Sequence, residues 1–276
     1  MLNDRSLWLI ARNVLRPSNY YALANMRHVY ERPLLAAGRY FFGYGEYPCV
    51  VQVRTPMGTQ SVTLFNSQDA ITLHEIFCRE DYRCFPTPQV VVDLGSNIGI
   101  SALYFLTRSA STYCELFEPD PRNVSSLLTN LNGFSNRFTL HEVAVADRQG
   151  ILPFKREPTG RYGSIDLETQ CSPDSSNGTE RPEHEHVQQD ATRDRIPVRV
   201  DHINTILDGV ISRHGSIDLL KIDTEGSELA TLFAIDHELL SRIRHIVIEW
   251  FDSAVTLEGF DASFSCDTIM FSNKVK

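Results

Sequence analysis

The sequence lacks a Cys-x-x-Cys pair, a long apolar run and an excess of basic residues. Its six cysteines are scattered over 276 residues, which favours reduced thiols over a disulfide framework or a zinc knuckle and predicts a cytoplasmic protein. No apolar run approaches the roughly 18 residues of a membrane span, and residues 1–17 match neither a signal peptide nor a membrane anchor. Lysine and arginine number 26 against 35 acidic residues, and the net charge of -9 does not favour binding to nucleic-acid phosphates. We therefore expect neither a membrane nor a nucleic acid as a partner.

Residues 1–88 are predicted to form an N-terminal extension of helices and a β-hairpin. The stretch YPCVVQVRTPMGTQSVTLFN alternates apolar and polar residues on either side of a Pro-Met-Gly-Thr turn, which is typical of a hairpin. Ser67 is a suitable cap for a helix that runs to Asp81, and two prolines then close the region. The other elements expected here are a helix from Leu7 to Leu15 and helical or irregular cover over residues 18–46.

From Gln89 onward, apolar strands alternate with helices. This order is typical of a parallel sheet covered by helices on both faces, so the predicted fold class is α/β with a doubly wound, mostly parallel, Rossmann-like sheet. With 42% hydrophobic residues, the chain can bury such a core within a domain of residues 89–276. The expected strands are VVVDL at 90, YCELFE at 113, RFTLHEV at 137, DLLKID at 218 and HIVIEW at 245, and the expected helices cover 98–107, 121–131, 201–213 and 228–233.

A polar insert at residues 156–195 interrupts this alternation. The segment is dominated by polar, proline and glycine residues, which predicts a long loop or lid. His184 and His186 lie within it, but two histidines in a solvated polar tract are explained by composition better than by a metal site.

A glycine-rich turn follows the first predicted strand of the sheet. In VVVDLGSNIGIS, the strand ends at Asp93, and Gly95, Asn97 and Gly99 lead into a helix. Glycine lets the backbone pass close to a ligand because it has no side chain and tolerates positive φ. The next strand ends at Glu118, where a carboxylate can accept hydrogen bonds from two ribose hydroxyls. Together these features predict a site for a nucleoside-bearing cofactor.

The charge of this turn distinguishes two such cofactors. A dinucleotide carries an anionic pyrophosphate, which a carboxylate such as Asp93 would repel. S-adenosylmethionine has no phosphate and carries a sulfonium and an ammonium group, which carboxylates attract. The turn therefore favours the methyl donor over NAD.

Carboxylates also follow the later strands. The ligand crevice of a doubly wound sheet lies beyond the carboxyl ends of its strands, so Asp93, Asp223 and Glu249 should lie close together if their strands are neighbours. Lys221 points to the same side of its strand as Asp223, and we expect the two to form an ion pair. Glu225 and Glu228 open the next helix, where they either face the ligand or only complement the helix dipole.

These motifs resemble the FkbM-type S-adenosylmethionine-dependent methyltransferases. The resemblance runs from about Gln89 to Trp250 and is carried by VDLGSNIG, by AVADRQG at 144–150 and most distinctively by LLKIDTEGSE; TILD at 205–208 and GSID at 163–166 also correspond. It implies a Rossmann-like class I methyltransferase fold. It further implies that the methionine end of the cofactor is held by Asp93, Gly95, Ser96, Asn97 and Gly99, the ribose by Glu118 and the adenine by Val143, Ala144 and Val145, with Asp223 near the transferred methyl.

The resulting hypothesis is an O-methyltransferase that acts on a hydroxyl of a sugar, glycoconjugate or secondary metabolite. Asp223 or Glu225 would orient or deprotonate the acceptor hydroxyl, without a metal. Three alternatives remain open: a divalent cation bound by Asp223, Glu225 and Glu249, a dehydrogenase, and a non-catalytic domain that binds a cofactor or a partner. The sequence departs from the family after Trp250, because 26 residues leave little room for the usual helix and antiparallel strand pair, although SFSCDTIMFSN could form a short version of them.

Overall fold

The computed structural model describes residues 17–84, 86–157, 159–161, 163–166, 195–249, 255–265 and 268–275. The helix expected from Leu7 to Leu15 and the two histidines of the polar insert lie outside these ranges. Four cysteines are described, and all four are free thiols: Cys49, Cys78, Cys84 and Cys114. In the described ranges, no helix has both the length and the apolar composition that crossing a membrane requires.

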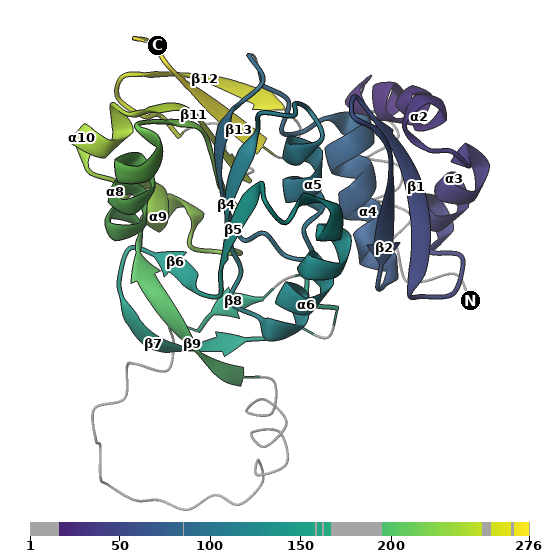
Figure 1. Cartoon of the computed structure of the whole chain (residues 1–276), viewed down its shortest axis with the longest axis horizontal. Coiled ribbons are helices and arrows are strands. Elements are labelled where there is room, and N and C mark those ends of the chain that lie inside the picture. Colours follow the sequence, from purple (N-terminus) through teal and green to yellow (C-terminus); the bar gives the residue numbers. More distant parts are fainter. Residues whose placement is uncertain are drawn as a thin grey trace, which may run out of the picture.

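A seven-stranded sheet forms the centre of the molecule (Figure 1). Its strand order is β12-β13-β11-β10-β3-β4-β5, in which the five strands from β11 to β5 are parallel. At the other edge, β13 runs antiparallel to β11, and β12 runs antiparallel to β13. The bounds are Val90–Leu94 for β3, Tyr113–Phe117 for β4, Phe138–His141 for β5, Ile217–Ile222 for β10, Ile243–Glu249 for β11, Phe260–Ser265 for β12 and Thr268–Asn273 for β13. The predicted doubly wound sheet is confirmed, and the residues after Trp250 do supply the antiparallel pair.

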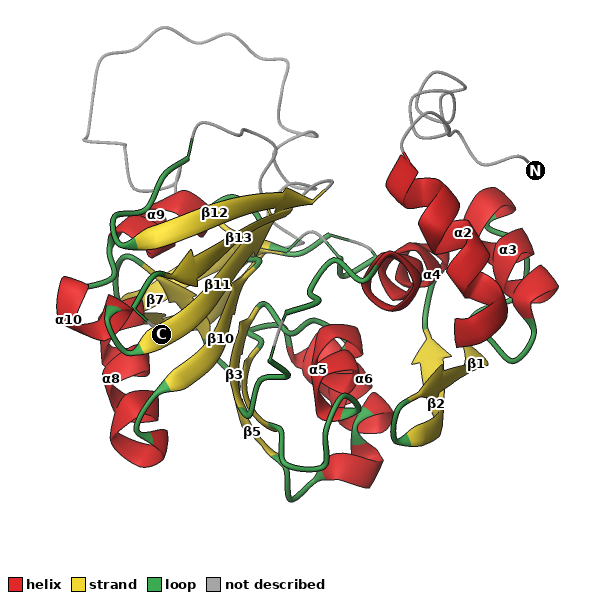
Figure 2. Cartoon of the chain, turned by 90° about the horizontal axis from the view of Figure 1, so that it is seen from above, coloured by secondary structure: helices red, strands yellow, loops and turns green. Residues whose placement is uncertain are grey.

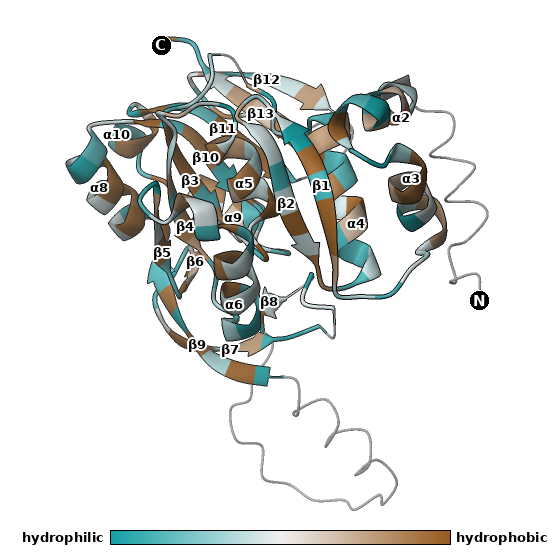
Figure 3. Ribbon diagram, turned by 45° about the vertical axis from the view of Figure 1, so that its right-hand side comes forward, coloured by the Kyte–Doolittle hydropathy of each residue, from teal (hydrophilic) through white to brown (hydrophobic). Residues whose placement is uncertain are grey.

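Successive side chains of the inner strands point to opposite faces of the sheet, and both faces are buried. Figure 3 shows these strands as largely hydrophobic. Val91 and Leu219 pack on the face covered by α5 and α6, whereas Val92 and Leu220 pack on the opposite face, covered by α8. Figure 2 shows helices on either side of the sheet. Their bounds are Ile100–Leu106 for α5, Pro121–Asn130 for α6, Ile203–His214 for α8, Glu228–Phe233 for α9 and His237–Leu240 for α10, with a short 3-10 helix at Asn132–Phe134.

The N-terminal extension contains the predicted hairpin and three α-helices within the described residues. The hairpin pairs β1 (Cys49–Thr55) with β2 (Gly58–Leu64), and α2 (Pro17–Val29) and α3 (Pro33–Phe42) form the helical cover. The cap of α4 (Ser67–His74) is Asn66 and not Ser67 as predicted, because Asn66 and Asp69 bond to each other's backbone in a capping box. The helix predicted to continue to Asp81 changes instead into a π-helical turn at Glu75–Arg79.

The extension packs on the α5 and α6 side of the sheet. Val62 and Leu73 share one hydrophobic cluster with Val91 of β3 and with Leu103 of α5. Asn130 of α6 also joins the two regions, because its side chain accepts a hydrogen bond from the N–H of Thr63 and donates to the carbonyl oxygens of Thr63 and Ile98. The division into residues 1–88 and 89–276 stays a prediction.

A second, four-stranded sheet lies beside the central one and was not predicted. Its strand order is β6-β9-β7-β8, and apolar side chains such as Leu152 and Val200 fill its own small cluster. The described ends of the polar insert are not loop throughout, because β8 and the first residue of β9 belong to this sheet. The bounds are Ala144–Ala146 for β6, Gly150–Lys155 for β7, Ser164–Ile165 for β8 and Arg195–His202 for β9.

Candidate functional site

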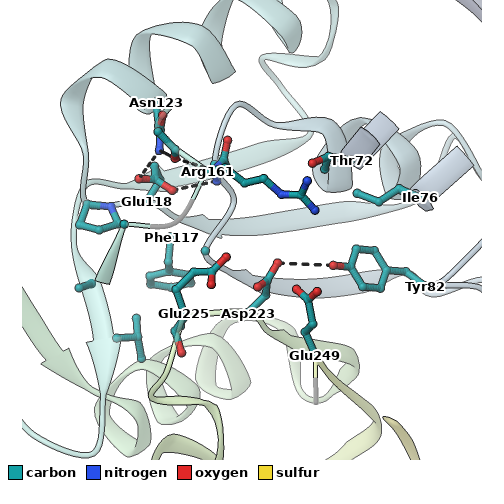
Figure 4. Close-up of a pocket in the computed structure, with 18 of the residues that line it drawn as sticks. Thr72, Ile76, Tyr82, Phe117, Glu118, Asn123, Arg161, Asp223, Glu225 and Glu249 are labelled. Carbon is teal, nitrogen blue, oxygen red and sulfur yellow. Dashed lines mark hydrogen bonds between the residues drawn. The ribbon is translucent and has the colours of Figure 1, made fainter. Parts of the chain in front are cut away.

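A cavity that is open to solvent lies at the carboxyl ends of the central strands (Figure 4). The residues that follow β3, β4 and β10 contribute Gly95, Glu118 and Asp223, and β11 contributes its last residue, Glu249. Among its described lining residues, six are acidic and only two are basic: Glu75, Asp81, Glu118, Asp223, Glu225 and Glu249 against Arg79 and Arg161. This position is where ligands bind in open α/β sheets, and the excess of carboxylates favours a ligand with positive charge.

The glycine turn after β3 brings the backbones of two strand ends together. Gly95 has a φ of +76°, and a Cβ at this position would overlap the carbonyl oxygen of Asp223. The N–H groups of Gly95 and Ser96 both donate to the carbonyl oxygen of Phe117, which joins the turn to the end of β4. Only glycine fits at position 95, because the turn needs both a positive φ and the close approach.

Glu118 lies almost fully buried at the floor of the cavity. Its Oε2 accepts a hydrogen bond from the N–H of Asn97 at 2.8 Å, and its Oε1 accepts from the N–H of Asp120 at 2.9 Å and from Nδ2 of Asn123 at 3.2 Å. A carboxylate has about four acceptor sites, so these three donors leave about one, on Oε2. Burial raises the pKa of Glu118 to about 7, although the N–H groups of Asp120 and Asn97 oppose that rise.

Apolar side chains line the cavity beside Glu118. They come from the end of β4, from the chain entering β6 and from β7 and β8, so the small second sheet closes this side. A flat, uncharged group would fit against them. The residues are Phe117, Val143, Ala144, Val145, Phe154 and Ile165.

A buried lysine connects β10 to the glycine turn. The Nζ of Lys221 lies 2.9 Å from Oδ1 of Asp93 and 3.2 Å from Oδ2 of Asp223, and it donates to the carbonyl oxygens of Leu94 and Gly95. Burial alone would lower the pKa of Lys221, but the carboxylates of Asp223 and Asp93 outweigh this and raise it. The predicted ion pair with Asp223 is confirmed, and the register of β10 on β3 adds Asp93 as a second partner.

Three carboxylates gather at the other end of the cavity: Asp223, Glu225 and Glu249 (Figure 4). Glu225 has a φ of +54°, in the left-handed region, and burial together with Asp223 raises its pKa to about 7. Burial, followed by the charge of Asp223, raises the pKa of Glu249 to about 9. Glu249 therefore holds a proton at neutral pH, next to an aspartate whose position Lys221 fixes.

The N-terminal extension forms the wall opposite these carboxylates. Tyr82 is buried, and its hydroxyl donates to Oδ2 of Asp223 at 3.5 Å. Glu75 and Arg79 come from the π-helical turn, and Arg161 reaches Oε2 of Glu75 at 3.0 Å from the loop between β7 and β8. Sequence reasoning missed these four residues because Glu75, Arg79 and Tyr82 precede every recognised motif, and because Arg161, although close to GSID at 163–166, lies in the polar segment predicted as a loop.

A model of the FkbM methyltransferase domain matches residues 93–268, which is more than half of the chain. The chain belongs to the FkbM methyltransferase family. The resemblance seen in the sequence is thereby confirmed. The matched residues include the glycine turn, Glu118 and all three carboxylates at the ends of β10 and β11, whereas residues 72–82 of the cavity wall precede the match.

The chain is also similar to curated proteins. It is 25% identical over 226 residues to the AMB antimetabolite synthetase AmbE of Pseudomonas aeruginosa, covering 73% of this chain and 10% of AmbE. It is 31% identical over 169 residues to the 2-O-methyltransferase NoeI of Sinorhizobium fredii, covering 60% of this chain and 65% of NoeI. The match thus spans less than two thirds of the length of either relative.

Among solved structures, a methyltransferase from Geobacter sulfurreducens is similar at a TM-score of 0.35 and 14% identity. That similarity covers 69% of this chain and 73% of the other. Likeness at this level adds nothing to the topology described above.

The predicted site residues are those that the FkbM resemblance assigns to the cofactor, together with Glu225 as a candidate base, and they divide into two groups. Asp93, Ser96 and Gly99 are not among the described residues that line the cavity, and Asp93 is fully buried between Lys221 and the hydroxyl of Ser101. Glu228 is likewise buried and not among the described lining residues, and its carboxylate accepts hydrogen bonds from the N–H groups of Thr224 and Gly226. The group that does line the cavity is Gly95, Asn97, Glu118, Val143, Ala144, Val145, Asp223 and Glu225.

The divalent-cation hypothesis finds no support in this geometry. Among the described residues, no group of three or more histidine, cysteine, aspartate or glutamate side chains is arranged to hold a metal ion. Asp223 is instead bound at Oδ2 by the ammonium of Lys221 and the phenol hydroxyl of Tyr82.

Proposed function

We propose that this FkbM-family methyltransferase uses S-adenosylmethionine to methylate a hydroxyl of a sugar, glycoconjugate or secondary metabolite. The observation that carries the proposal is the acidic lining of the cavity: even with Glu249 protonated, five other acidic side chains face two arginines among its described residues. Such a lining attracts a sulfonium and an ammonium group and repels a pyrophosphate. The similarity to NoeI, which is named a 2-O-methyltransferase, supports oxygen as the methylated atom.

The residues present fit this cofactor. Glu118 keeps about one acceptor site on Oε2, which suits a ribose hydroxyl, and the apolar strip of Val143, Ala144 and Val145 suits an adenine ring. The turn at Gly95 and Asn97 lies beside Asp223, where backbone and carboxylate groups would hold the methionine end. When bound, S-adenosylmethionine supplies a methyl group on a positively charged sulfur, which an acceptor oxygen displaces in line.

Asp223 is the residue best placed to act on the acceptor. Lys221 and Tyr82 both bind its Oδ2, so the carboxylate is held in one orientation, in which it would accept the proton of the acceptor hydroxyl. Glu249 is protonated at neutral pH and adds no second negative charge beside it. Glu225, with its pKa near 7, is the alternative base from the same loop.

Two measurements test the proposal. Calorimetry with S-adenosylmethionine should show binding, and mass spectrometry of a glycoside library incubated with the protein and the donor should show added methyl groups. Binding without any methylated product would favour the non-catalytic alternative. The predictions that neither nucleic acid nor membrane is a partner are open to direct binding assays.

Two variants separate the proposed roles. Asp223→Asn should lower kcat about 10²-fold or more while changing donor affinity only modestly, because it removes the proton acceptor. Glu118→Ala should instead weaken donor binding, because it removes the ribose acceptor and also the hydrogen-bond acceptor of the Asn97 and Asp120 N–H groups. Asp147→Asn, which removes an exposed ion pair with Arg148, is the control for both. Wild-type kinetics in both site variants would refute the assignment.

A further inference from the structure

The wall that faces the reacting end of the cavity comes from outside the family-matching region. Thr72, Glu75, Ile76, Arg79 and Tyr82 line the cavity from α4, the π-helical turn and the residues after it (Figure 4). The match to the FkbM domain begins only at residue 93. The donor end is therefore built from residues that the family model describes, whereas this wall belongs to the chain's own extension. Recognition of the acceptor is the function left for it.

Two arginines lie at this end of the cavity, Arg79 on the wall and Arg161 in the β7–β8 loop within the family match, and both are already engaged with carboxylates. Arg79 forms two hydrogen bonds to Asp81, the first from Nε to Oδ1 at 2.6 Å. Arg161 donates from Nη2 to Oε2 of Glu75 at 3.0 Å. An anionic group entering here would have to displace a carboxylate from its arginine or lie against an unneutralised acid. Bringing like charges together in this way is unfavourable, so an anionic acceptor should bind less well than its neutral counterpart.

The acids at this end are already under mutual repulsion. After burial, the largest influence that raises the pKa of Glu225, and likewise of Glu249, is the neighbouring carboxylate of Asp223. Glu75 raises the pKa of Glu249 further. Burial and these neighbouring carboxylates together raise the pKa of Glu249 to about 9, so a further anion brought here would meet the same repulsion from Asp223 and Glu75.

The same groups suit a neutral polyol. Carboxylates accept hydrogen bonds from hydroxyl groups without requiring a counter-charge, and threonine hydroxyls can both donate and accept. Thr72, Thr224 and Thr268 line this end, and Ile76 offers an apolar surface for the carbon face of a ring.

We propose that the acceptor is an uncharged polyhydroxy compound, and that Glu75 and Arg161 determine specificity by excluding acceptors with a carboxylate or phosphate near the reacting hydroxyl. This inference rests on the methyltransferase function proposed above. According to this inference, the charges of the Glu75–Arg161 ion pair determine which acceptors the site admits.

The test compares matched acceptors. A library of methyl glycosides is offered together with the uronate and the 6-phosphate of each sugar, and methylated products are identified by mass spectrometry before kcat/KM is measured. The neutral member should exceed its anionic counterparts by about tenfold or more in kcat/KM, since like-charge contact is costly. Calorimetry of the same sugars with protein saturated with S-adenosylhomocysteine gives a readout independent of turnover.

Two variants should move this selectivity in opposite directions. Glu75→Gln releases Arg161 from its carboxylate, so it should improve the relative kcat/KM of the anionic acceptors. Arg161→Gln leaves Glu75 without this partner and should reduce that relative kcat/KM further. Glu80→Gln is the matched control, because Glu80 also pairs with an arginine, Arg83 at 2.7 Å, but is not among the residues lining this cavity. Thermal unfolding confirms that each variant is folded.

The outcomes separate the two proposals. Methylation that favours the uronate or the phosphate would overturn the inference and leave the methyltransferase function standing. A selectivity that neither variant changes would remove Glu75 and Arg161 from the assignment and so refute it. Binding of S-adenosylmethionine with no methylated product from any sugar would overturn the proposed function, and the inference with it.

Discussion

The end of the cavity at Gly95 and Glu118 is built from backbone turns and strand ends of the central sheet, whereas the opposite wall is built from side chains of the N-terminal extension. At the first end, backbone N–H groups hold Glu118 in place. At the second, ion pairs such as Glu75–Arg161 set the charge. A turn fixed by backbone geometry tolerates little change, but a wall of paired side chains can change its charge by one substitution. We therefore predict that the end proposed to bind the donor tolerates few substitutions, whereas substitutions in the opposite wall can change which acceptor binds.

The largest effect should come from Lys221, which lies between the two ends. Lys221→Met removes the cation shared by Asp93 and Asp223, and leaving buried charge uncompensated costs about 3–5 kcal/mol of unfolding free energy. Denaturant unfolding measures the loss. Lys274→Met, which breaks only an exposed pair with Asp261, should stay close to wild type. Equal stability of the two variants would show that Lys221 does not join the ends.

A smaller effect is expected from the glycine turn at the donor end. Gly95→Ala forces a Cβ onto the carbonyl oxygen of Asp223 at a positive φ, and strain of this kind costs about 1–3 kcal/mol. Calorimetry should show weakened binding of S-adenosylmethionine, and unfolding should show lower stability. Gly133→Ala is the matched control, because its Cβ would meet nothing within 4 Å. If the two variants bound S-adenosylmethionine with the same affinity, the backbone geometry at Gly95 would not determine donor binding.

The smallest effect should appear at Glu249 and should depend on pH. The folded protein keeps the Glu249 proton up to a pKa of about 9, whereas the ordinary value is 4.5. Between these values the folded state binds more protons than the unfolded state, so this group's contribution to stability is lost as pH rises. Glu249→Gln should therefore stabilise the protein at pH 8 by on the order of 1–2 kcal/mol, and by much less at pH 5. Urea unfolding at both pH values measures this, with the exposed Glu238→Gln as control. A gain that did not shrink at pH 5 would contradict the raised pKa.

The sheet could be predicted because its signals are local. The apolar runs that begin at Val90, Tyr113 and Ile217 indicate strands even when their positions in the sheet are unknown, and all three are strands in the structure. The helix at Glu228–Phe233 has its predicted bounds. The second sheet was missed because β7 and β9 contain prolines, at Pro153 and Pro197, which argue against strands. Tertiary pairing of these two strands overrides that local preference.

The candidate site was predictable only in part, because some of its residues follow local sequence patterns and others reach it only through tertiary packing. Gly95, Glu118 and Asp223 follow strands of a recognisable sheet, so their position at its carboxyl edge could be deduced. Asp93 is the last residue but one of its strand, yet its side chain is buried beside Lys221, and the register that places these two residues next to each other leaves no mark in a single sequence. Tyr82 and Arg161 reach the cavity only through the packing of the extension and of the β7–β8 loop.

The π-helical turn at Glu75–Arg79 gives the acceptor wall its orientation. A turn of this type holds one residue more than an α-helical turn, and each residue of a helix is rotated by about 100° from the one before it. Deleting a single residue there would change the direction in which Asp81 and Tyr82, which both line the cavity, leave the turn. If this wall binds the acceptor as we propose, insertions and deletions at these five positions would alter the choice of acceptor, and Gly95 and Glu118 would keep their places in the sequence of the central sheet.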